Sequence, residues 1–202
     1  MLTFTDDEKA LISTLSIVGG WDDESDSSRA LKRKIKDFYL AAGDLCCYCL
    51  RDMRGWHRMS IDLEHVLPKS VYPQLMFEPR NLNLACKRCN MRIKGERVCF
   101  FVGTPQSAAD FLASEYSFIH PNLDKFEDHI SIFTVQYNRK LLVKYTVTDG
   151  STKGAQTYEF FRLRELERDS YDEAQGNARV EPSERMPASI AREVMAILSS
   201  IE

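Results

Sequence analysis

Apolar residues recur at helical spacing in two stretches near the start of this 202-residue chain. The first stretch, Thr5–Leu15, carries acids in its first turn, where the helix dipole favours negative charge. The second, Arg29–Ala42, places its apolar residues on one face of a 3.6-residue period: Leu31, Ile35, Phe38 and Ala42. An acidic, serine-rich linker, Asp22–Ser28, separates the two. We therefore predict two helices within residues 1–43.

The middle of the chain changes to shorter periods. Residues Trp56–Val66 partly alternate between apolar and polar and are stopped by Pro68, which predicts a strand that ends in a loop. A second strand is predicted at Asn81–Cys86, and the following Lys87–Lys94 has helical composition and then meets a glycine. Residues 44–100 are therefore expected to fold as strand, strand and helix.

Residues 101–202 mix both periods. Alternation over Ile130–Val147 predicts an antiparallel hairpin, which a strand at Thr157–Phe161 would extend. The other predicted elements are a short helix at Ser107–Ser114, a charged helical segment at Glu165–Ser170, a loop at Gly176–Pro187 and a helix at Ala188–Ile201. Together these elements indicate an α+β protein whose C-terminal extension either docks a partner or covers the core.

Composition agrees with a compact protein. With 44% hydrophobic and 28% charged residues, the chain can bury one substantial core, or a small core with a flanking subdomain. It has no run of about 18 apolar residues and no basic-then-apolar leader. We therefore expect no membrane span, a cytoplasmic location and a reducing environment that keeps thiolates intact.

Four cysteines form two Cys-x-x-Cys pairs: Cys46 with Cys49, and Cys86 with Cys89. Thiolates at this spacing are the ligand set of a closed, structural zinc site, with disulfides or unligated thiols as the alternative. The 36 residues between the pairs exceed the roughly 15–20 of a plain zinc ribbon, so a folded element is expected inside the loop. Cys47 could replace a neighbour as ligand, and Cys99, beside two phenylalanines, is expected to be buried.

The cysteine pairs belong to a longer series of motifs in a fixed order. The series is Cys46-Cys47-Tyr48-Cys49, Glu64-His65-Val66-Leu67-Pro68, Asn81-Leu82, and Cys86-Lys87-Arg88-Cys89-Asn90 with Lys94-Gly95. In this order the motifs resemble the HNH endonucleases of the ββα-metal type, in their four-cysteine, zinc-stapled form. The resemblance implies a zinc-stapled ββα-metal core, with flanking helices and a small antiparallel sheet, that hydrolyses DNA phosphodiester bonds.

Roles for four residues follow from this resemblance. His65 matches the general base, because an imidazole titrates near neutral pH. Glu64 and Asn90 match the oxygen ligands of a catalytic divalent ion, magnesium or manganese. Asn81 matches a residue that braces the loop carrying the base. Phosphate or DNA contact is expected from three cations: Lys94, Arg88 and Arg92.

The distribution of charge supports a phosphate ligand. The net charge of −3 by itself argues against a nucleic-acid partner. Between Arg51 and Arg97, however, ten Lys or Arg residues stand against five acids, a local excess of five positive charges. A merely solvated face would spread both signs evenly, whereas this excess coincides with the candidate site.

A further stretch, Phe118–Ile130, contains His120-Pro121, Asp124, Glu127 and His129. It is similar to a stretch that follows the nuclease core in the HNH subunits of Septu systems and of related retron modules, which act in bacterial anti-phage defence. That resemblance implies an ABC-type ATPase as the partner of the nuclease.

We therefore predict a metal-dependent HNH endonuclease that cuts DNA as the effector of a bacterial anti-phage defence complex. Two alternatives stay open: a zinc-stabilised module that binds nucleic acid or protein without catalysis, and an HNH nuclease that cleaves RNA or tRNA, since no residue pattern identifies a reader of the 2′-hydroxyl. A purely structural role for His65 also stays open.

Overall fold

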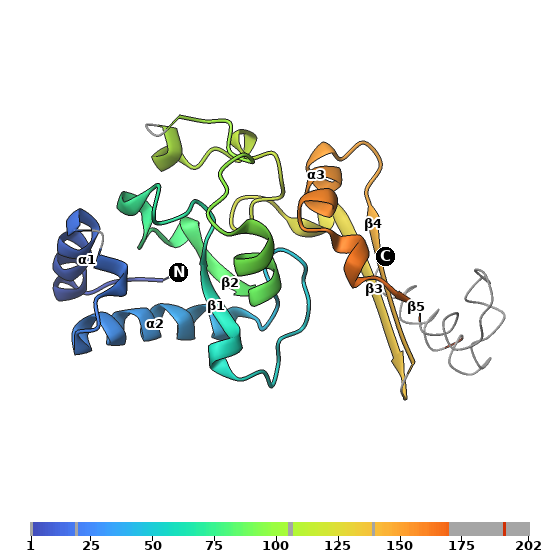
Figure 1. Ribbon diagram of the computed structural model, residues 1–202, viewed down its shortest axis with the longest axis horizontal. Coiled ribbons are helices and arrows are strands. Elements are labelled where there is room, and N and C mark those ends of the chain that lie inside the picture. The colour runs from blue at the N-terminus through green and yellow to red at the C-terminus, as the bar shows by residue number, and fades with distance from the viewer. Residues whose placement is uncertain (1, 19, 105–106, 139, 170–191, 193–202) are drawn as a thin grey trace. The chain divides into compact units, whose positions relative to one another are not determined.

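The computed structural model describes five parts of the chain (Figure 1): residues 2–18, 20–104, 107–138, 140–169 and 192. The predicted loop and helix within 176–201 lie outside them. Packing divides the chain into two compact units: Met1–Ser131 with Thr146–Glu165 as unit 1, and Ile132–Tyr145 with Leu166–Glu202 as unit 2. The predicted division into residues 1–43, 44–100 and 101–202 stays a prediction from the sequence. Along the described parts, no helix is long and apolar enough to cross a membrane.

Unit 1 begins with helix α1 (Asp6–Val18), at the predicted place. Its start is a capping box, in which the Glu8 N–H donates to Thr5 Oγ1 at 3.3 Å and the Thr5 N–H donates to Glu8 Oε2 at 2.7 Å. The same carboxylate pairs with Lys34 of the next helix at 2.6 Å. The first turn of α1 is therefore stabilised by its own capping hydrogen bonds and by an ion pair with the next helix.

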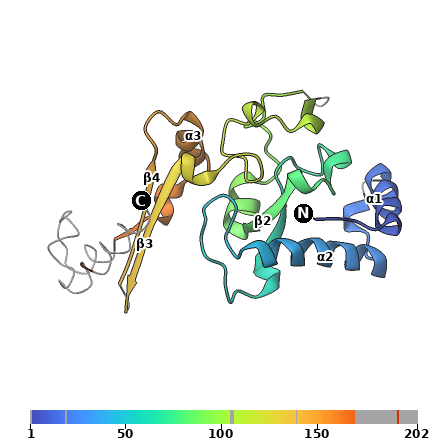
Figure 2. The same ribbon diagram turned by 180° about the vertical axis from the view of Figure 1, so that it is seen from behind.

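Helix α2 (Asp26–Ala42) begins before the predicted Arg29, because Ser25 caps it by accepting a backbone N–H. In both views α2 lies beside strand β2 (Leu82–Cys86) (Figure 1, Figure 2). The core that they share gathers residues of α1, α2, β2, the chain before α1 and the segment before β2: Leu2, Leu15, Leu31, Ile35, Met76, Phe77 and Leu82. Burial of its apolar face supplies most of the stability of α2, since short helices are marginal alone.

The predicted strand, strand, helix order is present in the middle of unit 1. Strand β1 (Ile61–His65) pairs antiparallel with β2, and its last residue, His65, lies opposite Leu82. The helical segment Arg88–Lys94 follows β2 and is a π-helix. It ends at Gly95, which has a φ of +52° and donates its N–H five residues back at 2.6 Å.

One predicted helix is replaced by two turns. Instead of a helix over Ser107–Ser114, 3-10 turns form at Ser107–Asp110 and Ala113–Glu115. They are separated by Phe111, whose φ of +53° lies in the left-handed region and interrupts a right-handed helix.

Helix α3 (Thr152–Phe160) stands where we predicted a strand at Thr157–Phe161, so that prediction was wrong. Ser151 caps the helix by accepting the Gly154 N–H at 2.9 Å. Gly154, Thr157 and Phe161 are all buried, at spacings of three and four residues that share one helical face. Burial at helical spacing therefore outweighs the local alternation of the sequence.

Unit 2 contains most of the predicted hairpin, formed by β3 (Ile130–Tyr137) and β4 (Lys140–Val147). A third short strand, β5 (Arg168–Asp169), pairs with β4. The predicted helical segment Glu165–Ser170 was therefore wrong at Arg168 and Asp169, whereas Glu165 and Leu166 belong to a 3-10 turn (Leu163–Leu166). Its charges suit a strand beside β4, because Glu167 pairs with a lysine of β4 at 3.5 Å.

The packing of α2 is tested by shortening Ile35, whose side chain is fully buried. We expect Ile35→Ala to lower the free energy of unfolding by about 2–5 kcal/mol, because it removes buried methyl groups and leaves a cavity. Urea unfolding with zinc in the buffer measures this. The matched control is Ile17→Ala in α1, where the side chain is 82% exposed. Equal effects of the two substitutions would contradict the described packing.

Candidate functional site

Four cysteines from two distant segments of unit 1 lie together: Cys46, Cys49, Cys86 and Cys89. All four are buried and none forms a disulfide. Their sulfur atoms lie within 4.8 Å of one another, and the Cys49 and Cys86 sulfurs are 4.0 Å apart. Two sulfurs of a tetrahedral zinc site are about 3.8 Å apart, given Zn–S bonds of about 2.3 Å. The cluster therefore has the donor type, number and spacing of a structural zinc site and can hold such a metal.

Backbone hydrogen bonds hold the first cysteine pair in a tight turn. The Leu50 N–H donates to the Cys46 carbonyl at 2.8 Å, and the Cys46 N–H donates to the Arg51 carbonyl at 3.0 Å. Leu50 adopts a φ of +48°, which closes the turn. The Cys47 N–H donates to the Leu84 carbonyl of β2 at 2.9 Å, which attaches the turn to the sheet.

The other two cysteines lie outside the cluster. Cys47 lies on the wall of a separate pocket, and burial raises the pKa of its thiol. Cys99 is exposed, not buried as predicted, because the adjacent Phe100 takes the buried position. Neither residue therefore replaces one of the four clustered cysteines.

Asn90, the residue after Cys89, lines an open pocket of about 640 Å³. Four of the residues singled out in the sequence line this pocket: Glu64, His65, Asn90 and Lys94. Strand β1 contributes the first two and the π-helix contributes the others. The fold thus gathers residues that are up to thirty positions apart in the sequence into one cavity beside the cysteine cluster.

His65 is held in one orientation and is neutral at neutral pH. Its Nε2 lies 3.0 Å from the Met76 carbonyl oxygen, which can only accept, so Nε2 carries the proton and Nδ1 carries the lone pair. The edge of its ring contacts Trp21, with ring centroids 4.4 Å apart. Burial lowers the pKa of His65 to about 4, against the opposing effect of the Met76 carbonyl. The imidazole therefore has the form that a general base requires.

Glu64 belongs to a buried polar group of three residues. Its Oε1 accepts from the Lys94 ammonium at 2.9 Å and from the Tyr48 hydroxyl at 3.0 Å. The side chains of Glu64 and Lys94 are each only 2% exposed. Burial raises the pKa of Glu64 to about 7, although Lys94 and Tyr48 both act to lower it. The positive charge of Lys94 is therefore balanced by Glu64 inside the protein.

Asn90 is oriented by a residue that the sequence reasoning missed. Its Nδ2 donates to Asp62 Oδ2 at 3.0 Å. Because only the amide nitrogen can donate, this bond fixes the orientation of the amide, and the Asn90 oxygen is not used by Asp62. Asp62 Oδ1 pairs with Lys87 at 2.8 Å, and both residues also line the pocket. Because Asp62 precedes Glu64 by two positions on a strand, both side chains start from the same face of β1.

Asn81 lies outside the pocket and supports a loop of its wall. Its Oδ1 accepts the Leu67 N–H at 2.7 Å, and its Nδ2 donates to the carbonyls of Leu67 at 3.0 Å and Leu75 at 3.1 Å. Its own carbonyl accepts the Val66 N–H at 2.9 Å. Asn81 is fully buried, so each of these bonds is shielded from water. The amide therefore joins the two ends of the loop between His65 and Met76.

The two predicted phosphate-binding arginines do not line this pocket. Arg88 donates to the carbonyls of Phe161 at 2.9 Å and Arg162 at 2.8 Å, and pairs with Glu165 at 3.1 Å. These bonds fasten the π-helix to the end of α3. Arg92 is exposed on the π-helix.

Asp62 and Trp21 line the pocket but were not predicted from the sequence, and only Asp62 could have been. Asp62 carries a usable signal, since an acid two residues before Glu64 on a predicted strand falls on the same face. Trp21 carries none, because it reaches His65 only through the packing of the turn between α1 and α2.

Among known proteins, the chain is similar to the Septu protein PtuB of Bacillus thuringiensis, with 30% identity over 122 residues. The aligned part is 60% of this chain and 37% of that protein, so the chain spans little more than a third of the length of the curated relative it matches. No protein-family model matches the chain. No solved structure matches it.

The metal-binding capacity of the cysteine cluster is tested with Cys89→Ser. We expect the purified chain to contain about one zinc ion, and the variant to lose it and to melt at a lower temperature, because metal binding contributes folding free energy. Elemental analysis and thermal unfolding measure both effects. The control is Cys99→Ser, which alters an exposed thiol and leaves both values unchanged. Zinc retained in full by Cys89→Ser would exclude the proposed ligand set.

Proposed function

We propose that this chain is a metal-dependent HNH-type endonuclease that hydrolyses DNA phosphodiester bonds as part of a bacterial anti-phage defence complex. The observation that carries the proposal is the meeting of Glu64, His65 and Asn90 in one open pocket beside the four-cysteine cluster. A carboxylate, a neutral imidazole and an amide oxygen in one cavity are the groups that metal-assisted phosphodiester hydrolysis uses.

His65 acts as the base. With Nε2–H donated to the Met76 carbonyl, Nδ1 accepts the proton of a water molecule as the water oxygen bonds to phosphorus. The bond from phosphorus to the leaving sugar oxygen then breaks, and its electron pair stays on that oxygen. The lowered pKa keeps the imidazole unprotonated before the reaction.

Glu64 and Asn90 would hold the catalytic divalent ion, magnesium or manganese. Both offer oxygen atoms, the donors that hard cations prefer, and the Asp62 contact leaves the Asn90 amide oxygen available. When bound, the ion would supply Lewis-acid polarisation of the scissile phosphate and would stabilise charge on the leaving oxygen. Lys94 holds Glu64 in place through the buried ion pair.

Substrate phosphates are met by cations at the pocket wall. Lys69 and Lys87 line the pocket, and their ammonium groups are partly exposed. Each already has an acidic partner, Asp22 at 3.7 Å and Asp62 at 2.8 Å, which a phosphate would compete with. The positive excess of this region in the sequence supports that assignment.

The similarity to the Septu protein PtuB supports a role in defence. Within such a complex, we place this chain as the nuclease and an ABC-type ATPase as the partner that restrains or licenses it.

The catalytic role is tested by DNA cleavage with magnesium or manganese, comparing wild type with His65→Gln. Glutamine retains an N–H for the Met76 carbonyl and lacks the imidazole base, so we expect cleavage to fall at least about 100-fold. The matched control is His57→Gln, an exposed histidine outside the pocket. Zinc content and thermal unfolding verify that both variants are folded.

Other results would change the assignment. Full activity of His65→Gln would exclude the base. Cleavage of RNA but not DNA by the wild type would move the substrate class to RNA. DNA binding by the zinc-loaded wild type without cleavage, alone and with its co-purified partner, would favour a binding module.

A further inference from the structure

The His-Pro-x-x-Asp stretch after the core, which the proposed chemistry leaves unused, folds as a rigid turn. The His120 N–H donates to Asp124 Oδ2 at 2.7 Å, and the Asn122 N–H donates to His120 Nδ1 at 3.2 Å. The His120 ring is fully buried, and Asp124 pairs with Lys153 of α3 at 2.6 Å. The turn is therefore held by hydrogen bonds within itself and by an ion pair with α3.

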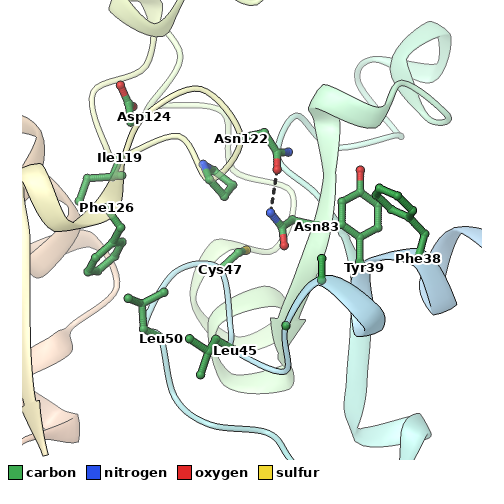
Figure 3. A pocket seen from close by; sticks show the side chains of 13 residues that line it. Phe38, Tyr39, Leu45, Cys47, Leu50, Asn83, Ile119, Asn122, Asp124 and Phe126 are labelled. Atoms are coloured by element: carbon green, nitrogen blue, oxygen red, sulfur yellow. Dashed lines mark hydrogen bonds between the residues drawn. The ribbon is translucent and has the colours of Figure 1, made fainter. Parts of the chain in front are cut away.

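Asn122, at the tip of this turn, reaches across to the start of β2. Its Nδ2 donates to the Arg80 carbonyl at 2.8 Å and to the Leu82 carbonyl at 2.9 Å. Its Oδ1 accepts from Asn83 Nδ2 at 2.7 Å, as Figure 3 shows. One amide therefore makes three hydrogen bonds to the segment on both sides of Asn81.

That segment is the one on which the orientation of His65 depends. Leu82 is the antiparallel partner of His65 in the β1–β2 ladder. Asn81 holds both ends of the loop between Val66 and Met76, and the Met76 carbonyl receives the His65 Nε2–H. A displacement of the Asn81 segment would therefore shift the imidazole in two ways: through the β1–β2 pairing and through the loop that ends at Met76.

The exposure of Asn122 argues against a role in general stability. The residue is exposed overall and is absent from the buried core, so its amide contributes little apolar burial. Water can replace the amide at the carbonyl of Arg80, which is an exposed residue, although Leu82 itself is fully buried. A rigid turn that directs one amide at both carbonyls beside Asn81 fixes position, which water does not.

We propose that Asn122 is a positioning residue of the pocket, which sets the orientation of His65 through the Asn81 segment. The effect on catalysis rests on the proposed nuclease function, whereas the effect on the imidazole does not. The His120–Asp124 turn is then part of the catalytic apparatus of unit 1, even though it lies more than fifty residues beyond His65 in the sequence.

The pocket in Figure 3 supplies a constraint on the substitution. Asn122 and Asn83 line a cavity of about 370 Å³ together with apolar side chains such as Phe38 and Phe126. Because this space is already open, a change at Asn122 creates no new buried void. Loss of its hydrogen bonds is therefore the main effect of a substitution there.

The test compares Asn122→Asp and Asn122→Ala with Asn83→Ala. Aspartate has nearly the same shape but lacks the N–H donors, and it sets a carboxylate against two carbonyls. Asn83→Ala is the matched control, since it removes one of the three bonds, together with the bond from the Leu84 N–H to Asn83 Oδ1, and leaves both carbonyl bonds. All variants are checked for zinc content and thermal unfolding.

Two measurements on the full chain read out the position of His65. The first is solvent exchange of the imidazole Nε2–H by NMR; the chain has four histidines, and His65→Gln assigns the signal. We expect exchange about tenfold faster in both Asn122 variants and unchanged in Asn83→Ala, because a loosened Met76 contact opens more often. The second is DNA cleavage, where kcat is expected to fall about 10–100-fold with KM unchanged, because binding cations are untouched while the base is misplaced.

The outcomes separate this inference from the proposed function. Faster exchange in a protein whose wild type does not cleave DNA would support the positioning role and reject the nuclease. Unchanged exchange and unchanged kcat in both Asn122 variants would overturn the positioning role. A lower melting temperature with kcat reduced only in proportion to the unfolded fraction would also overturn it, since that result describes a structural residue alone.

Discussion

The gathering of four cysteine sulfurs within 4.8 Å is the constraint on which the centre of this protein depends. It joins the turn after α2 to the junction of β2 and the π-helix, and so closes a loop of 36 residues. A two-stranded sheet is marginal by itself, and closing a loop of this length costs conformational entropy. A metal bound by the four thiolates would offset that cost, because its binding free energy would become folding free energy. The cysteine cluster and the core shared with α2 therefore hold the β1–β2 pair in position together.

The region beside the cysteine cluster contains a buried ion pair. Glu64, Lys94 and Tyr48 are buried together, and the pair survives there because each charged group has its partner. The same low-dielectric surroundings lower the pKa of His65 and raise that of Glu64, since burial disfavours the charged form of each. Burial thus favours the neutral imidazole of His65, whereas Lys94 and Tyr48 favour the carboxylate form of Glu64 against the effect of burial.

Sequence reasoning succeeded where one local pattern decided the outcome. The acids at the start of α1, the alternation of β3 and β4 and the Cys-x-x-Cys pairs each indicated the element that forms. It failed where packing overruled the local pattern, as in α3, whose buried residues follow helical spacing despite an alternating sequence. Packing also gives Arg88 partners that its charge alone does not indicate, since its guanidinium donates to carbonyls at the end of α3.

The sequence by itself determined which chemical groups this protein possesses and how they are spaced: two Cys-x-x-Cys pairs, an acid beside a histidine, and an asparagine directly after Cys89. Side-chain chemistry and spacing are local properties, so they can be read without a fold. Only the tertiary structure decided which groups meet, since Trp21, Met76 and Asn122 reach the His65 region through packing. The protonation and orientation of His65 were decided there too, because burial and hydrogen-bond partners exist only once distant segments have come together.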